Sequence, residues 1–237
     1  MTRPGRAGVV EVAFTDRHGG VSRPPFDSLD LGGAADRCDE AKANADRVAR
    51  GLGVGRLTVM HQASGCGVAV VDSAAPPQAP CDAMVTATYD VALCVRVADC
   101  VPVVLADVNS GVLGVVHAGR RGVTAGVVGA TIDTMRARGG EEIEAWVGSH
   151  VCGGCYEVPA KMRAEVSAAV PAAYSCTTWG TPALDLGAAV TRQLEESRCR
   201  VSDVSGCTLE SPDLFSYRRD GARSGRFAGI VVLKPPT

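Results

Sequence analysis

Residues 94–122 read CVRVADCVPVVLADVNSGVLGVVHAGRRG, and the rest of the chain is arranged around them. Two apolar, mostly β-branched segments, 101–106 and 112–116, flank residues 107–111, which are Asp, Val, Asn, Ser and Gly. β-branched residues favour strands, whereas Asp, Asn and Gly favour tight turns. The pattern predicts two buried strands that form a hairpin.

Each predicted strand carries one side chain that can do chemistry. Cys100 precedes the first strand and His117 ends the second, so the hairpin can bring them together at one end of the sheet. A thiolate and an imidazole are good zinc ligands, but a catalytic zinc needs a third protein ligand and a water molecule. Alternatively, His117 deprotonates Cys100 and the two form a nucleophile and its base. A purely structural interpretation, a buried free cysteine and a hydrogen-bonded core histidine, also fits the pattern.

Asp99 is a third catalytic candidate because it stands directly before Cys100. Neighbouring side chains in a regular strand point to opposite faces of the sheet. Asp99 can therefore orient His117 only if the strand bulges at this point.

Strand-like and helical segments alternate along the remaining chain. This alternation indicates an α/β or α+β fold, with a mixed β-sheet flanked by helices in a single domain over residues 1–237. The expected helices cover 37–52, 123–138, 159–170 and 183–198, and further strands are expected at 9–14, 57–60, 68–72, 91–97, 145–148 and 228–233.

The composition narrows the class of protein. The chain has 237 residues, 46% hydrophobic and 21% charged, with a net charge of −2. A net charge of −2 does not indicate binding to a nucleic acid or to an anionic membrane. No apolar run is as long as a bilayer span. The start of the chain lacks the apolar core of a signal peptide. We therefore expect a cytoplasmic protein, a monomer or a weak dimer, that acts on a small molecule.

The cysteines are expected to be reduced thiols. There are 10 of them, but the chain has ample core residues of other kinds, unlike a secreted disulfide scaffold. Cys152 and Cys155 have the spacing of a metal-binding pair, yet no second such pair accompanies them. The sequence thus favours a loop with two free thiols over a zinc ribbon.

The main cationic cluster surrounds Arg218 and Arg219, with Arg223 and Arg226 close behind, and Arg120 lies near His117. Paired arginines can clamp a phosphate or a carboxylate. A solvated basic loop explains the same charges equally well.

Five ordered motifs resemble the YfiH family, which is also called the laccase-domain or multicopper polyphenol oxidase family and includes the peptidoglycan-editing factor. The resemblance extends over nearly the whole chain. The motifs are TDRHGGVS at 15–22, FDSLDLG at 26–32, ADCVP at 98–102 with HAGRRG at 117–122, YEV at 156–158 and FSYRRD at 215–220.

The resemblance implies a fold similar to that of a cysteine hydrolase and a site of two histidines and one cysteine that binds zinc or copper. It implies purine nucleoside phosphorolysis, adenosine deamination or, in some members, phenol oxidation. A distant member uses the cysteine as a hydrolytic nucleophile on a ureido compound. A multicopper centre needs many more histidines than the 4 in this chain, so copper is not expected.

The chain departs from the family at its first metal ligand. The family motif QVHG here reads QASG at 62–65, so Ser64 stands where the histidine would be. His61 lies three residues earlier and can replace the missing ligand only if the backbone bends, and His150 is the other candidate. Loss of one ligand in three weakens the expected zinc site.

We expect an enzyme of a divergent kind, with Cys100, His117 and Asp99 as catalytic residues. The family-like form is purine nucleoside phosphorolysis or adenosine deamination, with zinc held by Cys100, His117 and His61 and with phosphate as a co-substrate. The alternatives are a metal-independent Cys100–His117 enzyme with a specialised substrate and an inactive binding paralogue. Expected substrate contacts are Arg17, Gln62, Ser64, Arg120 and Arg218.

Overall fold

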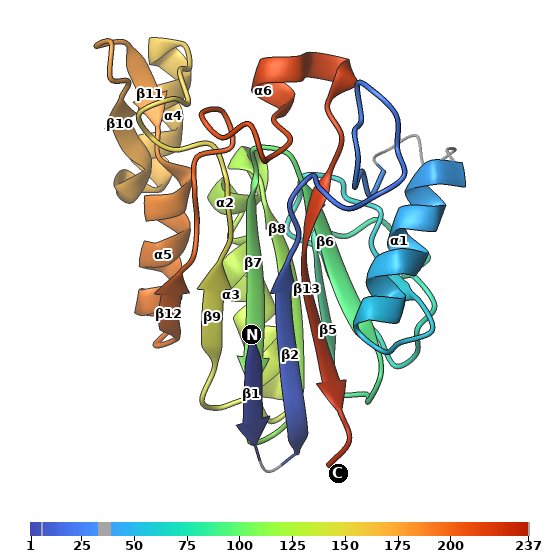
Figure 1. The fold of residues 1–237 in the computed structure, drawn as a ribbon. Helices are drawn as coiled ribbons and strands as arrows, with labels where there is room; N and C mark the ends of the chain where they lie inside the picture. The colour runs from blue at the N-terminus through green and yellow to red at the C-terminus, as the bar shows by residue number, and fades with distance from the viewer. Residues whose placement is uncertain (6, 33–38, 237) are drawn as a thin grey trace.

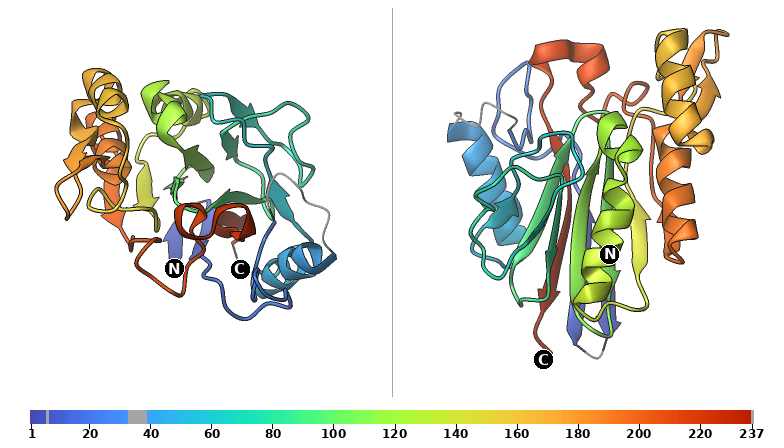
Figure 2. Two further views of the ribbon diagram at one scale, coloured as in Figure 1. Left: turned by 90° about the horizontal axis from the view of Figure 1, so that it is seen from above. Right: turned by 180° about the vertical axis from the view of Figure 1, so that it is seen from behind.

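Two stacked β-sheets form the centre of the molecule, and helices cover their outer faces (Figures 1 and 2). The computed structural model describes residues 1–5, 7–32 and 39–236. In the five-stranded sheet the order is β1 (Thr2–Gly5), β2 (Gly8–Phe14), β13 (Phe227–Lys234), β6 (Ala92–Val97) and β3 (Leu57–Val59). In the six-stranded sheet it is β12 (Arg200–Asp203), β9 (Glu144–Val147), β7 (Val101–Asp107), β8 (Val112–Ala118), β5 (Ala83–Thr86) and β4 (Val68–Val70).

The helices lie on opposite sides of this sandwich (Figure 2). One helix, α1 (Asp39–Gly51), covers the five-stranded sheet. The helices α2 (Arg120–Thr124), α3 (Val127–Ala137), α4 (Ala160–Ala169) and α5 (Leu186–Glu196) lie on the side of the six-stranded sheet, with the small hairpin β10 (Tyr174–Cys176) and β11 (Pro182–Leu184). The short helix α6 (Tyr217–Asp220) lies across one end of the sandwich.

Strand β7 shows why the central segment is apolar at nearly every position. Val103 and Leu105 pack against the helices, whereas Val104 and Ala106 pack against the second sheet. Because both faces are buried, the strand needs apolar side chains at odd and even positions alike. All residues of β7 and β8 are buried.

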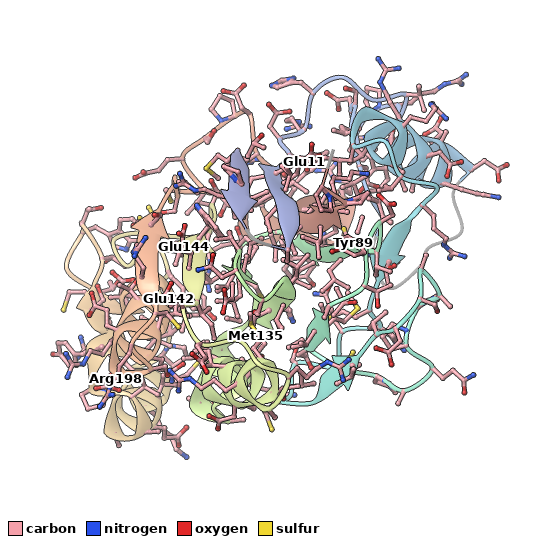
Figure 3. The ribbon with its side chains drawn as sticks, turned by 90° about the horizontal axis from the view of Figure 1, so that it is seen from below. Glu11, Tyr89, Met135, Glu142, Glu144 and Arg198 are labelled. Atoms are coloured by element: carbon pink, nitrogen blue, oxygen red, sulfur yellow. The ribbon has the colours of Figure 1, made fainter. Side chains whose placement is uncertain are left out.

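The helix-covered face is packed closely at the end that Figure 3 shows from below. Met135 of α3 is fully buried, and a Cβ built on Gly114 of β8 would lie 3.0 Å from its sulfur. A larger residue at position 114 would push α3 away from the sheet.

The prediction of an α/β fold with mixed parallel and antiparallel pairing is confirmed, with the central strands divided between two sheets and β10 and β11 in a separate hairpin. The predicted hairpin is present as β7 and β8, with Pro102 opposite His117. The helix expected at 123–138 is interrupted at Gly126, whose φ is 80°. Strand β5 was not expected. The expected helix start at 37 lies outside the described residues, which resume at Asp39.

No helix in the described part of the chain combines the length and the apolar character that a membrane crossing requires.

Candidate functional site

Cys100 and His117 meet at one end of the six-stranded sheet, on the face that looks toward the other sheet. Val101 pairs with Ala118 and Pro102 with His117 in the antiparallel register, which sets Cys100 beside the end of β8. The Cys100 side chain lies beside the imidazole of His117 and contributes to the raised pKa of that ring. A Cβ on Gly119 would lie 3.2 Å from the Cys100 sulfur and 3.6 Å from His117 Nε2, so a glycine here leaves room for both groups.

A buried carboxylate, Asp82, hydrogen-bonds His117 on the side of the ring away from Cys100. Its Oδ1 lies 2.8 Å from His117 Nδ1, and its side chain is 1% exposed. The backbone N–H groups of Ser64 and Gly65 donate to its two oxygens at 2.9 and 2.6 Å. Asp82 stands directly before β5, and the N–H of His117 donates to its carbonyl oxygen at 2.7 Å. The result is the series Cys100–His117–Asp82 across three neighbouring strands.

Sequence reasoning missed Asp82, because its pairing with His117 depends on β5 lying next to β8. The available signal was an acidic residue directly before the short apolar segment AMV at 83–85. A carboxylate in that position is costly to bury unless it has a partner.

The surroundings of His117 and Asp82 determine the charges of these two side chains. Burial by itself would lower the pKa of His117, but its hydrogen bonds and electrostatic attraction to Asp82 and Cys100 outweigh burial and raise the pKa to about 9. Burial raises the pKa of Asp82, but hydrogen bonds from His117, Gly65 and Ser64 reverse this and leave the pKa lowered. At neutral pH the centre therefore holds an imidazolium beside a carboxylate.

Asp99 was expected to orient His117 only if the strand bulges at this point. The backbone is irregular there, but the Asp99 side chain points elsewhere. Its carboxylate accepts hydrogen bonds from Thr208 Oγ1 and from the backbone N–H of Arg218, both at 2.6 Å. Its φ of 89° turns the backbone out of the regular strand geometry, so the side chain reaches the C-terminal loops instead. Asp82 has the orienting position.

The Cys100–His117 pair opens into a cavity of about 690 Å³ at the end of the sandwich where α6 lies (Figure 1). Both sheets, the helices α2, α5 and α6 and the loops at this end contribute to its walls. The lining residues are Gln62, Ser64, Arg96, Val97, Ala98, Asp99, Cys100, His117, Arg120, Val151, Tyr156, Leu186, Tyr217, Arg218 and Arg226.

Two of the predicted substrate contacts, Arg120 and Arg218, meet at Tyr156. The guanidinium carbon of Arg218 lies 4.7 Å from the centre of the Tyr156 ring, and Arg120 is close enough to this side chain to affect its pKa. Burial raises the pKa of Tyr156, an effect that the two arginines oppose. Two guanidinium groups and a phenol on one wall can hold an anion such as phosphate.

The other predicted contacts differ in their placement. Ser64 is exposed and lines the cavity. Gln62 also lines it, but its amide exchanges two hydrogen bonds with the backbone of Arg96, at 2.9 and 3.2 Å. Arg17 is not among the lining residues. Its guanidinium donates to the carbonyl of Asp27 at 2.8 Å and packs over Phe215, so it braces the N-terminal loop.

The expected third metal ligand is not in the cavity. His61 is exposed and lines a separate cavity of about 630 Å³. His150 is buried, and its Nδ1 lies 2.9 Å from the carbonyl oxygen of Gly148. In the described ranges, neither residue forms with Cys100 and His117 a group whose ligand atoms could share an ion. The donor set therefore does not fit the zinc site that the resemblance implies.

A different group of side chains could hold a metal ion. The ligand atoms of Cys152, Cys155, Cys207 and Glu210 all lie within 4.8 Å of one another. The sequence singled out the first two cysteines but not their approach to Cys207.

Comparisons with known proteins agree with the motifs. The family described as multi-copper polyphenol oxidoreductase laccase matches residues 11–234. The chain is 51% identical to a purine nucleoside phosphorylase of Streptomyces coelicolor over 232 residues, covering 93% of this chain and 94% of the relative. It is 49% identical to one of Streptomyces griseus over 235 residues, covering 95% of each.

Solved structures have the same fold. A DUF152 protein of Neisseria meningitidis superposes with a TM-score of 0.84 at 29% identity, covering 99% of this chain and 98% of the other. The YfiH protein of Bacillus licheniformis superposes with a TM-score of 0.84 at 23% identity, covering 98% and 99%. Taken with the match over residues 11–234, these similarities show that the chain belongs to the YfiH-type laccase-domain family.

Proposed function

We propose that the protein is a purine nucleoside phosphorylase whose acid–base group is His117, which Asp82 orients and which Cys100 flanks. The observation that carries the proposal is the hydrogen bond between His117 and the buried carboxylate of Asp82, at a cavity whose wall bears Arg120 and Arg218. The names of the relatives from the two Streptomyces species support the choice of substrate. The donor set around Cys100 does not complete a zinc site, so the proposed chemistry uses the side chains alone.

Phosphorolysis requires the protein to hold the phosphate and to transfer a proton to the leaving base. A phosphate oxygen bonds to C1′ of the ribose while the bond from C1′ to the purine nitrogen breaks, and the electron pair leaves with the base. The base takes up one proton, and the phosphate loses one as the ester forms. Arg120 and Arg218 would hold the phosphate. The His117 imidazolium would donate the proton to the leaving base and recover one from the phosphate, while Asp82 keeps the ring in place.

The test is base release from inosine and adenosine with and without phosphate, with ribose 1-phosphate measured as the second product. We expect phosphate-dependent release that falls about 10²–10⁴-fold in His117→Asn, because general acid–base catalysis contributes in this range. Release that does not depend on phosphate, or a His117→Asn variant as fast as the wild type, would contradict the proposal. Inosine formed from adenosine would identify deamination instead.

Arg120→Gln tests the phosphate contact. A hydrogen bond to a charged group contributes about 1.5–3 kcal/mol, so the KM for phosphate should rise about tenfold or more. Arg121→Gln is the matched control, because Arg121 is exposed on the same helix and does not line the cavity. Equal KM values in the two variants would remove Arg120 from the site.

A second function has its own supporting observation. Cys100, His117 and Asp82 stand in the order of a nucleophile, a base and an orienting carboxylate. A thiol enzyme would form a covalent bond from the Cys100 sulfur to its substrate, and Cys100→Ala would abolish turnover. The phosphorylase proposal predicts measurable phosphorolysis in Cys100→Ala and no substrate adduct on Cys100 in mass spectra of the quenched wild type. An inactive binding paralogue would turn over nothing in either assay.

A further inference from the structure

Three cysteines and one glutamate converge beside the cavity, outside the reaction centre. Cys152 and Cys155 lie on the loop after β9, whereas Cys207 and Glu210 lie on the loop after β12. Their ligand atoms are all within 4.8 Å of one another. The thiol of Cys155 lies 3.3 Å from Glu210 Oε1, and the N–H of Cys152 lies 3.5 Å from the Cys207 sulfur.

The backbone holds the two loops in the arrangement that a metal site needs. In the first loop, the N–H groups of Cys155 and Tyr156 donate to the carbonyl of Cys152 at 3.0 and 2.9 Å. This turn directs two sulfurs to one side. His150 pairs with Cys207 in an isolated parallel bridge, which fixes the second loop against the first.

We propose that Cys152, Cys155, Cys207 and Glu210 form a structural zinc site. Zinc favours four tetrahedral ligands from cysteine, histidine and carboxylate, with zinc–sulfur bonds of about 2.3 Å. Ligand atoms on such a tetrahedron lie about 3.8 Å apart, so closing the site needs movements of an ångström or less. Thiolates select zinc over magnesium or calcium. Three sulfurs and one carboxylate fill all four positions, so the site is closed to substrate.

The site would stiffen one wall of the cavity. Tyr156 directly follows Cys155, and Thr208, which follows Cys207, donates to the Asp99 carboxylate. Both Tyr156 and Asp99 line the cavity. A metal shared by the two loops would therefore fix the wall on which Arg218 packs against Tyr156. This proposal stands independently of the reaction that the cavity carries out.

The experiment measures metal content in protein produced with zinc in the medium and purified without a His tag. We expect about one zinc per chain in the wild type. The Cys100→Ser variant should keep its zinc, and Cys207→Ser and Cys155→Ser should lose most of it. Cys176→Ser is the matched control, because this exposed cysteine lies outside the group. A Cys207→Ser variant with full zinc, or a Cys100→Ser variant without it, would overturn the assignment.

A second readout covers the case in which the cysteine variants fail to fold. Cobalt exchanged into the wild type should give the thiolate-to-metal absorption of a tetrahedral sulfur site, and titration with an organomercurial should release one zinc. A chelator should lower Tm, since metal binding contributes to folding. Zinc-free wild type, iron or copper in its place, or a disulfide between any two of the three cysteines in protein from a reducing cell would overturn the proposal.

Discussion

At the scale of single residues, His117 and Asp82 form a charged pair in a place where neither charge is stable alone. The pair is 8% and 1% exposed, and burial opposes both charges. Isolated buried charges are costly, so each side chain keeps its charge because the other is present. Cys100 and His117 could be predicted to meet from the sequence alone, because a hairpin determines its own register. Asp82 could not, because it comes from a strand outside the hairpin.

The raised pKa of His117 predicts a pH-dependent stability. The ordinary pKa of 6.5 applies to the unfolded chain and about 9 to the folded one, so the folded state binds the proton more tightly. The stabilisation is complete below pH 6.5 and is lost as the pH rises to about 9. It amounts to about 3 kcal/mol. Denaturant unfolding at pH 6, 7.5 and 9 should show this loss in the wild type and not in His117→Gln. A wild-type stability that is flat across this range would contradict the shift.

Ser64 offers a direct test of why the family-type metal site is incomplete. Ser64 has a φ of 58° and lines the cavity beside Cys100 and His117, and histidine tolerates this left-handed conformation better than most residues. We expect Ser64→His to bind about one zinc per chain more than the wild type. The gain should vanish in the double variant with Cys100→Ser. If His61→Ala lowers the zinc content of the wild type, the exposed histidine is a ligand after all.

At the scale of elements, the boundaries of α5 explain one difference between expectation and structure. A helix was expected over 183–198, but residues 182–184 pair with β10 instead. Asp185 then caps the helix, its Oδ1 accepting a hydrogen bond from the N–H of Ala188 at 2.8 Å. The apolar periodicity that predicts a helix does not mark where a preceding strand ends. Pairing with β10 decides this, and β10 is too short to be recognised in the sequence.

The Asp185 N-cap of α5 should make a measurable contribution to the free energy of unfolding. Asp185→Ala should lower the free energy of unfolding by about 1 kcal/mol, because an N-cap side chain satisfies a backbone N–H at the start of the helix. Asp185→Asn keeps an acceptor and should restore most of this loss. Urea unfolding of the three proteins at pH 7 measures the difference. If Asn is as destabilising as Ala, the hydrogen bond to Ala188 is not what stabilises the helix start.

At the scale of the whole molecule, the charge is distributed unevenly. The chain has a net charge of −2, yet Arg96, Arg120, Arg218 and Arg226 all line the cavity with Cys100. The α/β class and the central hairpin could be predicted from periodicity and β-branched residues. The division into two sheets could not, because strands that are buried on both faces look alike in either sheet. The gathering of four arginines depends on that division, since Arg96 and Arg226 belong to or directly precede strands of the five-stranded sheet, whereas Arg120 follows β8 of the six-stranded sheet. Arg218 comes from α6, which lies across the end of both sheets.

Clustered arginines predict a salt dependence for an anionic substrate. The KM for phosphate in the proposed reaction should rise with ionic strength between 0.01 and 0.5 M, since salt screens attraction over about 30 Å at the lower value and a few ångströms at the higher. The KM for the neutral nucleoside should change much less. Initial-rate assays in sodium chloride measure both. Parallel changes in the two constants would point to a general salt effect.

The three residues Cys100, His117 and Asp82 stand at the ends of β7, β8 and β5, which are adjacent strands and wholly buried. Such strands exchange their amide protons only when the entire molecule opens. We therefore expect the residues Cys100, His117 and Asp82 to separate only when the whole molecule unfolds. Heat should then destroy activity and tertiary structure in one step. Any adjustment during turnover falls to the loops above the sheet ends.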